Sequence, residues 1–550
     1  MRVILLWMLT VLALDCWIAA LLFHNRVLTA SAVVMSLFSV FGVYRPVTRK
    51  KSRERTGWKL GPAVELTNPD RPESIQNAVL SERFLNLGFL AIGAPGSGKT
   101  IAALSYIQSI GQRSPVHGWA FFEGKGDTDI YRKCVAMNCA PKYFISSELP
   151  GSDSVNLMAG AAHDVVDRLG KILIGETAST SFYADVQRAV LTRMVPLLFL
   201  TDEAVNLRDL YTVLTVEDAG RELLRRVRLT GADPVAVTLA EEWFNTPRAS
   251  RLPQISGLLN RLFVFVSGPN TDRLNAYQPS LDIHQAVERG ESIYFHLPLT
   301  SFARSVAIAL IEMFGVEARA RQLGGTEHLA SYPLIFDDWG AFFHEGFGAF
   351  SARCRSAAMP LSFGFQSRAQ LQAVSPTYAD ELDDTIATKI ILRVHGAATA
   401  RYASELLGQY DAAEVSTSEL GERSGTSLGH QRKYRIDARQ LRELQPGEAL
   451  VTTLETRGGR ETNPLWRLRI PVPHFADWEA VPMPETRLHS AGKGWDLWSR
   501  YLDPRTLSKL HVEVLEAGGK RFSAPDTPLR AEHAHMAANR GLRREGGVAR

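Results

Sequence analysis

The chain has few cysteines, and their spacing suits neither a cross-linked nor a metal-bound framework. Four occur among 550 residues: Cys16, Cys134, Cys139 and Cys354. Four residues separate Cys134 from Cys139, and neither a histidine nor a second cysteine pair follows at the spacing of a zinc site. This pattern argues against a disulfide scaffold or structural zinc and indicates free thiols in a reducing compartment.

The sequence also lacks internal repeats and a strong excess of one charge. Its formal net charge is +4 and its pI about 8.8, values shared by many proteins that never bind nucleic acid, so charge alone assigns no partner. Apolar and charged residues occur at ordinary globular frequencies, and the length provides a core for a large domain with an insertion.

Long apolar runs are confined to the amino-terminus. Residues 3–23 are apolar except for Thr10 and Asp15, and residues 27–44 are largely apolar again. A helix needs about 20 residues to cross the hydrocarbon core, and only residues 24–26 separate the two runs. A signal peptide would not be followed at once by a second span, so we expect a transmembrane helical hairpin.

A basic flank orients this hairpin. It consists of Arg45, Arg49, Lys50, Lys51, Arg53 and Arg55. By the positive-inside tendency these residues stay in the cytoplasm, which places both termini and the body of the chain there. At this location, membrane lipid headgroups are a more natural partner for the flank than DNA.

The body alternates short apolar runs with helical patterns. Strand-like runs lie at 85–92, 119–122, 292–297, 334–336, 361–365 and 389–394, and helical spacing is found at 100–110 and 303–320. Strands that alternate with helices predict an α/β fold with a mostly parallel sheet. Between residues 158 and 284 the periodicity is helical, as in 186–199 and 207–216, which indicates an all-α insertion domain.

These patterns divide the chain into four parts. Residues 1–55 are the predicted membrane hairpin with its flank, 56–157 and 285–476 the α/β domain, 158–284 the insertion and 477–550 a partly disordered carboxy-terminal tail. Within the α/β domain, the polar stretch 411–435 is predicted to be an exposed loop.

The run 85–92 enters a complete phosphate-binding loop of the form G-x-x-x-x-G-K-[ST]. It reads Gly93-Ala94-Pro95-Gly96-Ser97-Gly98-Lys99-Thr100. Glycines let successive backbone amides wrap around phosphates, and the helix that starts here adds its positive end. Lys99 would meet the β- and γ-phosphates and the Thr100 hydroxyl would bind Mg²⁺, so ATP and Mg²⁺ are the predicted cofactors.

A second acidic site is expected at the end of another strand. The apolar residues 334–336 are followed by Asp337 and Asp338. Asp337 would hold Mg²⁺, generally through water, and Asp338 would orient or deprotonate the attacking water. About 240 residues separate this pair from the loop, and the helical insertion accounts for that distance.

Together these motifs resemble the type IV coupling proteins, the TraD, TraG and TrwB group. The resemblance extends over residues 85–451. It is carried by the loop 93–100, the acid-x-Lys-Gly-acid turn 123–127, Asp337-Asp338, Arg355 with the segment 361–371 that contains Gln366-Ser367 and Gln370-Leu371, and Thr399-Ala400 with Leu406-Leu407-Gly408.

The resemblance implies a RecA-like P-loop NTPase motor domain, a homo-hexameric ring and the bacterial inner membrane as location. It further implies that Gln366 senses the γ-phosphate and that Arg355 is the finger reaching a neighbour's nucleotide, with Arg353 as its rival. The implied partners are DNA, single-stranded and held through its phosphates, a relaxase with its relaxosome proteins, and the channel of a type IV secretion system.

Two features depart from the family pattern. The family usually has Asp-Glu where this chain has Asp337-Asp338. The Asp338 side chain is one methylene shorter than glutamate, so its carboxylate reaches the attacking water differently. A misplacement of about 1 Å can lower the rate about 10²-fold. The turn at 24–26 is also much shorter than the periplasmic segment common in the family.

Two other functions stay open. A chromosome translocase of the FtsK type shares the core fold, but it predicts more membrane spans and a winged-helix end, for which we find no convincing pattern after residue 451. The second is a receptor that recruits effector proteins without hydrolysing ATP.

A basic cluster in the insertion either receives DNA or a relaxase, or is a solvated helix face; it consists of Arg221, Arg225, Arg226 and Arg228.

Overall fold

The computed structural model describes the chain from residue 57 to residue 519 with short gaps. The gaps are residues 82–84, 113–116, 176–181, 232–233, 269, 299, 326–329, 339, 341, 343–346, 373–377, 421–422, 458–459 and 486–491. The predicted membrane hairpin lies outside the described residues. Among those described, no helix is both long and apolar enough to cross a bilayer.

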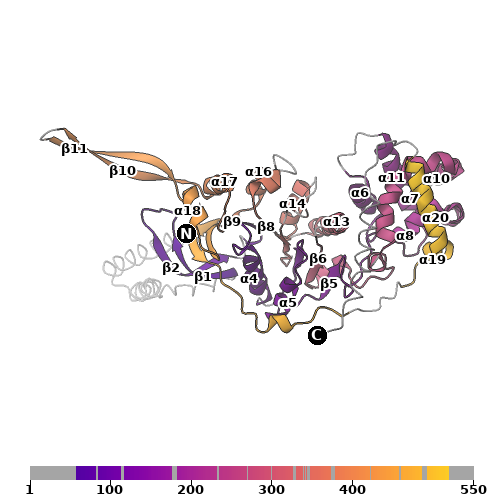
Figure 1. Ribbon diagram of the computed structural model, residues 1–550, viewed down its shortest axis with the longest axis horizontal. Coiled ribbons are helices and arrows are strands. Elements are labelled where there is room, and N and C mark those ends of the chain that lie inside the picture. Colours follow the sequence, from indigo (N-terminus) through magenta and orange to yellow (C-terminus); the bar gives the residue numbers. More distant parts are fainter. Residues whose placement is uncertain are drawn as a thin grey trace, which may run out of the picture. The chain divides into compact units, whose positions relative to one another are not determined.

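An eleven-stranded sheet forms the centre of the unit that begins at residue 59 (Figure 1). Its strand order is β2-β1-β15-β12-β9-β3-β8-β7-β4-β6-β5. The bounds are β1 (Gly57–Glu65), β2 (Glu73–Ser81), β3 (Phe89–Ile92), β4 (Ala120–Glu123), β5 (Tyr143–Ser146), β6 (Ile293–His296), β7 (Leu334–Asp337), β8 (Leu361–Phe365), β9 (Thr388–Ile391), β12 (Glu448–Thr452) and β15 (Leu465–Arg469).

The seven strands from β9 to β5 are parallel, while β12, β15 and β1 continue the sheet in antiparallel pairing. All six predicted strand runs overlap a parallel strand, so the α/β prediction is confirmed. The strand that carries the phosphate loop, β3, is separated from the strand of the acid pair, β7, by β8. Residues at the carboxyl ends of these three strands are therefore neighbours.

Aromatic packing holds this part of the sheet in register. The rings of Phe295, Phe122, Phe336 and Phe363 come from the adjacent strands β6, β4, β7 and β8, and successive centroids are 4.5, 4.6 and 5.4 Å apart. Stacked aromatic pairs at such distances contribute about 0.5–1.5 kcal/mol each beyond the area they bury. A slip of one residue would turn every ring to the opposite face, so the ladder fixes the register that aligns the strand ends.

Helices complete the α/β domain, which is the predicted motor domain and is called the motor body below. They are α4 (Lys99–Gly111), α5 (Thr128–Ala136), α12 (Ile283–Glu288), α13 (Ser301–Gly324), α14 (Phe347–Ser356), α15 (Arg368–Gln372), α16 (Tyr378–Thr385), α17 (Ala397–Leu407) and α18 (Ala438–Glu443). The helix α4 packs against β3, β7 and β8, and α14 packs against α13 and β8.

The predicted insertion is helical in the described residues. It contains α6 (Ala162–Leu173), α7 (Phe182–Phe199), α8 (Leu207–Thr215), α9 (Glu217–Leu229), α10 (Pro234–Asn245) and α11 (Arg248–Val266). A capping box starts α8, because the Asn206 side chain accepts from the Asp209 amide while Asp209 accepts from the Asn206 amide. The helix α6 packs against α13 of the motor body.

The prediction of a loop at 411–435 is wrong. Residues Gln409–Leu420 form β10 and Arg423–Tyr434 form β11, an antiparallel hairpin paired along its whole length from Gln409 opposite Tyr434 to Leu420 opposite Arg423 (Figure 1). A two-stranded ribbon does not need the apolar alternation of a half-buried sheet, so this polar stretch lacks the sequence signal of a strand.

Part of the predicted carboxy-terminal tail is helical. Its described part contains η3 (Trp478–Ala480), α19 (Leu497–Tyr501) and α20 (Pro504–Gly519). η3 packs against α5 of the motor, α19 against α8, and α20 against α11. We call residues 477–519 the carboxy-terminal strap, since they contact first the motor body and then the helical insertion.

Candidate nucleotide-binding site

The phosphate loop joins β3 to α4 with the backbone that its glycines permit. Gly96 and Gly98 have φ values of +71° and +115°, which residues with a side chain rarely adopt. At Gly93 a Cβ atom would lie 2.4 Å from Ser97 Oγ and 2.9 Å from Leu392 Cβ, so no larger residue fits without moving the loop. Only glycine therefore permits this close turn.

The loop holds unused polar groups that suit a phosphate. Ser97 Oγ is buried and has no hydrogen-bond partner among the described residues. Lys99 is buried and its ammonium donates to the carbonyl oxygens of Gly93 at 2.7 Å and Ala94 at 3.0 Å. Burial, then the nearby Lys125, lowers the pKa of Lys99, while Asp337 and Asp338 oppose this effect. The ammonium is thus held over the loop by two weak acceptors that phosphate oxygens can replace.

Strand β7 brings the acid pair to the loop. The Thr100 hydroxyl donates to Asp337 Oδ2 at 3.0 Å, across a sequence separation of 237 residues. A hydroxyl and a carboxylate at this distance are oxygen ligands of the kind Mg²⁺ prefers, so the residues fit the predicted metal site. The structure therefore places Thr100 and Asp337 together.

Asp338 and Gln366 also meet. Asp338 has φ +60°, a conformation that turns it out of the strand direction, and it is 9% exposed. Gln366 follows β8, and its Nε2 lies 3.3 and 3.4 Å from the two carboxylate oxygens of Asp338. The Gln366 backbone N–H donates to Gln370 Oε1 at 3.0 Å, which fixes the start of α15. The second glutamine of the motif therefore positions the first.

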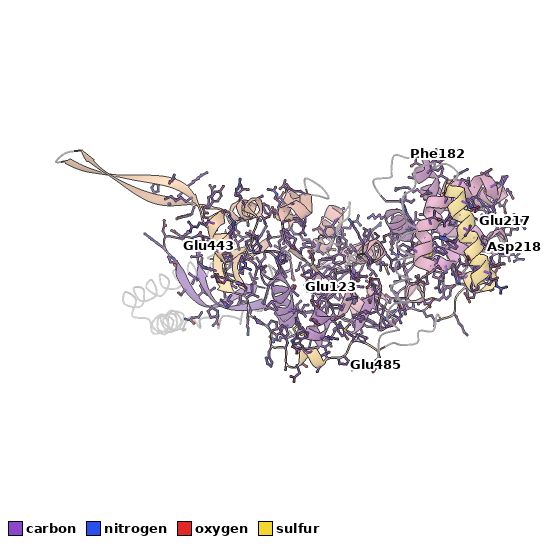
Figure 2. The ribbon with its side chains drawn as sticks, viewed as in Figure 1. Glu123, Phe182, Glu217, Asp218, Glu443 and Glu485 are labelled. Carbon is purple, nitrogen blue, oxygen red and sulfur yellow. The ribbon has the colours of Figure 1, made fainter. Side chains whose placement is uncertain are left out.

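A turn that sequence reasoning gave no role completes the site. Glu123 ends β4 opposite Asp337 of β7 and lies inside the motor body (Figure 2). It is fully buried, and its two oxygens accept the amides of Lys125 at 2.6 Å and Gly126 at 2.9 Å. The Lys125 ammonium reaches Asp337 Oδ2 at 3.1 Å. The signal was present in the acid-x-Lys-Gly-acid spacing, but the contact depends on the β4–β7 register.

Burial raises the pKa of Glu123 to about 7, with a smaller contribution from Asp337, while the amide donors of the turn lower it. The Glu123 carboxyl is thus close to balance between its two protonation states at neutral pH. Ionisation strengthens its bonds to the two turn amides, because charged acceptors bind amides more strongly than neutral ones do.

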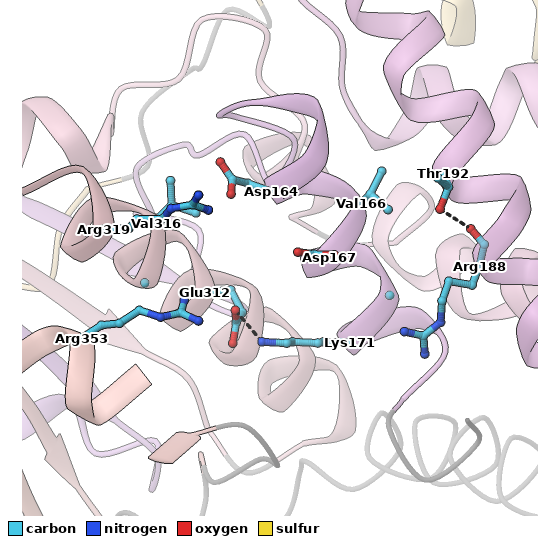
Figure 3. A pocket seen from close by; sticks show the side chains of 12 residues that line it. Asp164, Val166, Asp167, Lys171, Arg188, Thr192, Glu312, Val316, Arg319 and Arg353 are labelled. Carbon is cyan, nitrogen blue, oxygen red and sulfur yellow. Dashed lines mark hydrogen bonds and ion pairs between the residues drawn. The ribbon is translucent and has the colours of Figure 1, made fainter. Parts of the chain in front are cut away.

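The two arginine candidates lie apart from this cluster. Arg355 is exposed near the end of α14 and makes no hydrogen bond or ion pair with any residue that the structure describes. Arg353 lines a cavity of about 300 Å³ among α6, α7, α13 and α14, where it extends toward Glu312 (Figure 3). Arg353 therefore faces its own chain, whereas Arg355 is exposed.

The basic cluster of α9 is largely paired. Arg221 contacts Glu217 and Asp218, Arg226 contacts Glu203 and Glu222, and Arg228 contacts Glu241. In the described residues only Arg225 of the four has no such partner. The cluster is thus a mostly neutralised helix face, which favours the solvated-face interpretation.

Part of the chain matches a known protein family. Residues 337–451 match the family model described as the TraM recognition site of TraD and TraG. The match runs from Asp337 through the Gln366 segment and the β10–β11 hairpin to β12. No sequence among the curated proteins matches the chain.

Solved structures show the same fold. The unbound bacterial conjugative coupling protein TrwBdeltaN70 aligns with a TM-score of 0.52 and 15% identity over 74% of this chain and 89% of its own. TrwB in complex with the non-hydrolysable GTP analogue GDPNP aligns with a TM-score of 0.52 and 15% identity, over 77% and 97%. TrwB in complex with ADP and Mg²⁺ gives 0.50 and 14%, over 76% and 96%.

Proposed function

We propose that this chain, a type IV coupling protein by its family match and its motifs, hydrolyses ATP to move nucleic acid. The observation that carries the proposal is the meeting of the loop, the acid pair and Gln366 at adjacent strand ends. Separate motifs that converge on one edge of a parallel sheet form the usual place for ligand binding in such folds.

Each residue has a defined task in this proposal. Lys99 leaves its two carbonyl acceptors for the β- and γ-phosphates, and Thr100 with Asp337 holds Mg²⁺, which neutralises phosphate charge. Asp338 orients the attacking water, and Gln366, bonded to it, reports whether the γ-phosphate is present. Arg355 stabilises the transition state in the next subunit of a homo-hexamer, a contribution of about 10³ to 10⁵ in related phosphoryl-transfer systems.

The cargo belongs to the same proposal. The chain would be anchored in the bacterial inner membrane by residues 1–55, bind single-stranded DNA through its phosphates and deliver a relaxase–DNA substrate to a type IV secretion channel. The description of the matching model as a TraM recognition site supports a relaxosome protein as partner. The pairing of the α9 arginines removes them as the preferred DNA contact.

The test is ATP hydrolysis by the full-length chain with and without single- and double-stranded DNA. We expect turnover stimulated by DNA and lost in Lys99→Ala. Lys99→Ala removes the loop ammonium, whereas the control Lys142→Ala removes a lysine from a distant pair with Glu291 and should keep wild-type turnover. ATP binding and ring assembly without turnover would instead support the receptor function, for which the short Asp338 side chain is the motivating feature.

A further inference from the structure

Lys125 occupies the oxygen that the magnesium site needs. Its Nζ lies 3.1 Å from Asp337 Oδ2, and the same oxygen accepts the Thr100 hydroxyl at 3.0 Å. The Asp337 side chain is 2% exposed and that of Lys125 is 36% exposed. The Lys125 ammonium, which solvent can reach, therefore contacts a buried oxygen of Asp337. The same oxygen accepts the Thr100 hydroxyl and is the predicted metal ligand.

The turn holds the lysine backbone firmly while its side chain keeps its freedom. Glu123 fixes the amides of Lys125 and Gly126, and Gly126 has φ +81°, which closes the turn. The Asp127 side chain then accepts the Asp129 amide and starts α5. Lysine carries a compact charge on a flexible four-carbon stem, so the ammonium can leave Asp337 without any change in the turn.

The ammonium and a divalent cation exclude each other at this oxygen. Two cations this close repel each other strongly, and the magnesium ion carries two charges. Lys99 adds a third positive group close by, since the two lysines interact electrostatically. Lys125 and the metal therefore compete for Asp337 Oδ2.

We propose that Lys125 is a counter-ion switch: it holds Asp337 in place while no metal is bound and is displaced when Mg²⁺ enters with the nucleotide. Lys125 is thus a positioning residue that sets how strongly metal and nucleotide binding are coupled. The inference rests on the proposed ATPase function, because it uses the same phosphate loop and acid. In this proposal Lys125 opposes metal binding rather than assisting it.

The test compares the Kd for fluorescent ADP in EDTA with the Kd in Mg²⁺, measured on the full-length chain. The Kd in EDTA divided by the Kd in Mg²⁺ measures how strongly metal and nucleotide binding are coupled. In Lys125→Met we expect this ratio to increase about three- to tenfold, or about 0.6–1.4 kcal/mol, because the metal no longer displaces an ammonium. Lys125→Arg keeps the charge and should leave the ratio within about twofold of wild type.

The matched control is Lys171→Met. Lys171 pairs with Glu312 at 2.8 Å and its side chain is 29% exposed, so this variant loses an equivalent ion pair away from the loop. Lys171→Met should keep the wild-type ratio. If Lys125→Met does not fold, Lys125→Gln retains a donor for Asp337 without the charge and should also increase the ratio.

Two results would overturn the inference. An unchanged ratio in the neutral variants would mean that Lys125 does not compete with the metal. A decreased ratio would mean that the lysine helps to bind the metal–nucleotide complex. If the wild-type chain bound ADP in neither condition, the proposed function itself would fail, which separates that failure from failure of the switch.

Discussion

Glu222 connects the carboxy-terminal strap to the helical insertion, and its removal should release the strap. The carboxylate is 7% exposed. It accepts the Trp495 indole N–H at 3.2 Å, the Tyr501 hydroxyl at 2.7 Å and the Arg500 guanidinium at 3.0 and 3.2 Å. Burial raises the pKa of Glu222, but these donors outweigh it and leave the pKa below its ordinary value. The carboxylate is therefore ionised when the strap is bound.

The magnitude follows from these bonds. A hydrogen bond to a charged group contributes about 1.5–3 kcal/mol, and the contributions of donors that share one acceptor do not add in full. Arg500 is 42% exposed, so solvent screens its share, whereas Trp495 is buried and would keep an unpaired N–H. We therefore expect Glu222→Ala to weaken strap docking by about 3 kcal/mol, which corresponds to a roughly 100-fold larger population of the released state.

Limited proteolysis with trypsin measures this population. Cleavage after Arg500, Arg505 and Lys509 requires α19 and α20 to open, and its rate follows the open population when reclosing is fast. The control Glu242→Ala removes an exposed glutamate of α10 whose side chain has no partner among the described residues, and it should cleave like wild type. A Glu222→Ala rate within threefold of wild type would refute the reasoning, as would equal acceleration of cleavage inside the motor body.

Three further predictions concern the motor. Gly93→Ala should weaken ATP binding at least about tenfold, because the new Cβ would lie 2.4 Å from Ser97 Oγ. The control Gly396→Ala places its Cβ 3.7 Å from the nearest atom, Thr399 Oγ1, at a negative φ, and should bind ATP normally in the same equilibrium titration. Gln366→Ala should lower single-turnover hydrolysis at least about tenfold while the ATP Kd stays within threefold, and an equal loss of affinity would assign Gln366 to binding instead. Asp383 has a pKa raised to about 6 by burial, so its proton stabilises the fold fully below the unfolded value near 3.8 and this stability is lost as pH rises through 6. Asp383→Asn keeps an acceptor for the Tyr402 hydroxyl. It should therefore be more stable than wild type by about 1 kcal/mol at pH 7.5, after discounting for solvent screening, and equally stable near pH 4. Thermal unfolding that shows no pH-dependent difference between the two proteins would contradict this assignment.

The phosphate site could be predicted because its determinants are local. The strands β3 and β7 are short apolar runs, and candidate site residues come directly after or at the end of them: Gly93 follows β3 and Asp337 ends β7. Parallel strands place these ends at one edge, so the contact between Thr100 and Asp337 follows once both strands are recognised. The sequence did not specify that Lys125 would lie on the same oxygen, because that depends on which strand pairs with β7.

The strap shows why other parts could not be predicted. The partners of two of its residues lie nearly 300 residues earlier: Glu222 binds Trp495, and Asp209 accepts the Leu497 amide at 2.9 Å. The acids that pair with the α9 arginines lie much nearer in sequence, in α9 itself and in neighbouring segments. Arg226 pairs with Glu203 at 2.5 Å, and it also contacts Glu222, the acid that binds the strap. A row of arginines in one helix therefore indicates a nucleic-acid surface only after the acids of the same helix and of its neighbours have been counted.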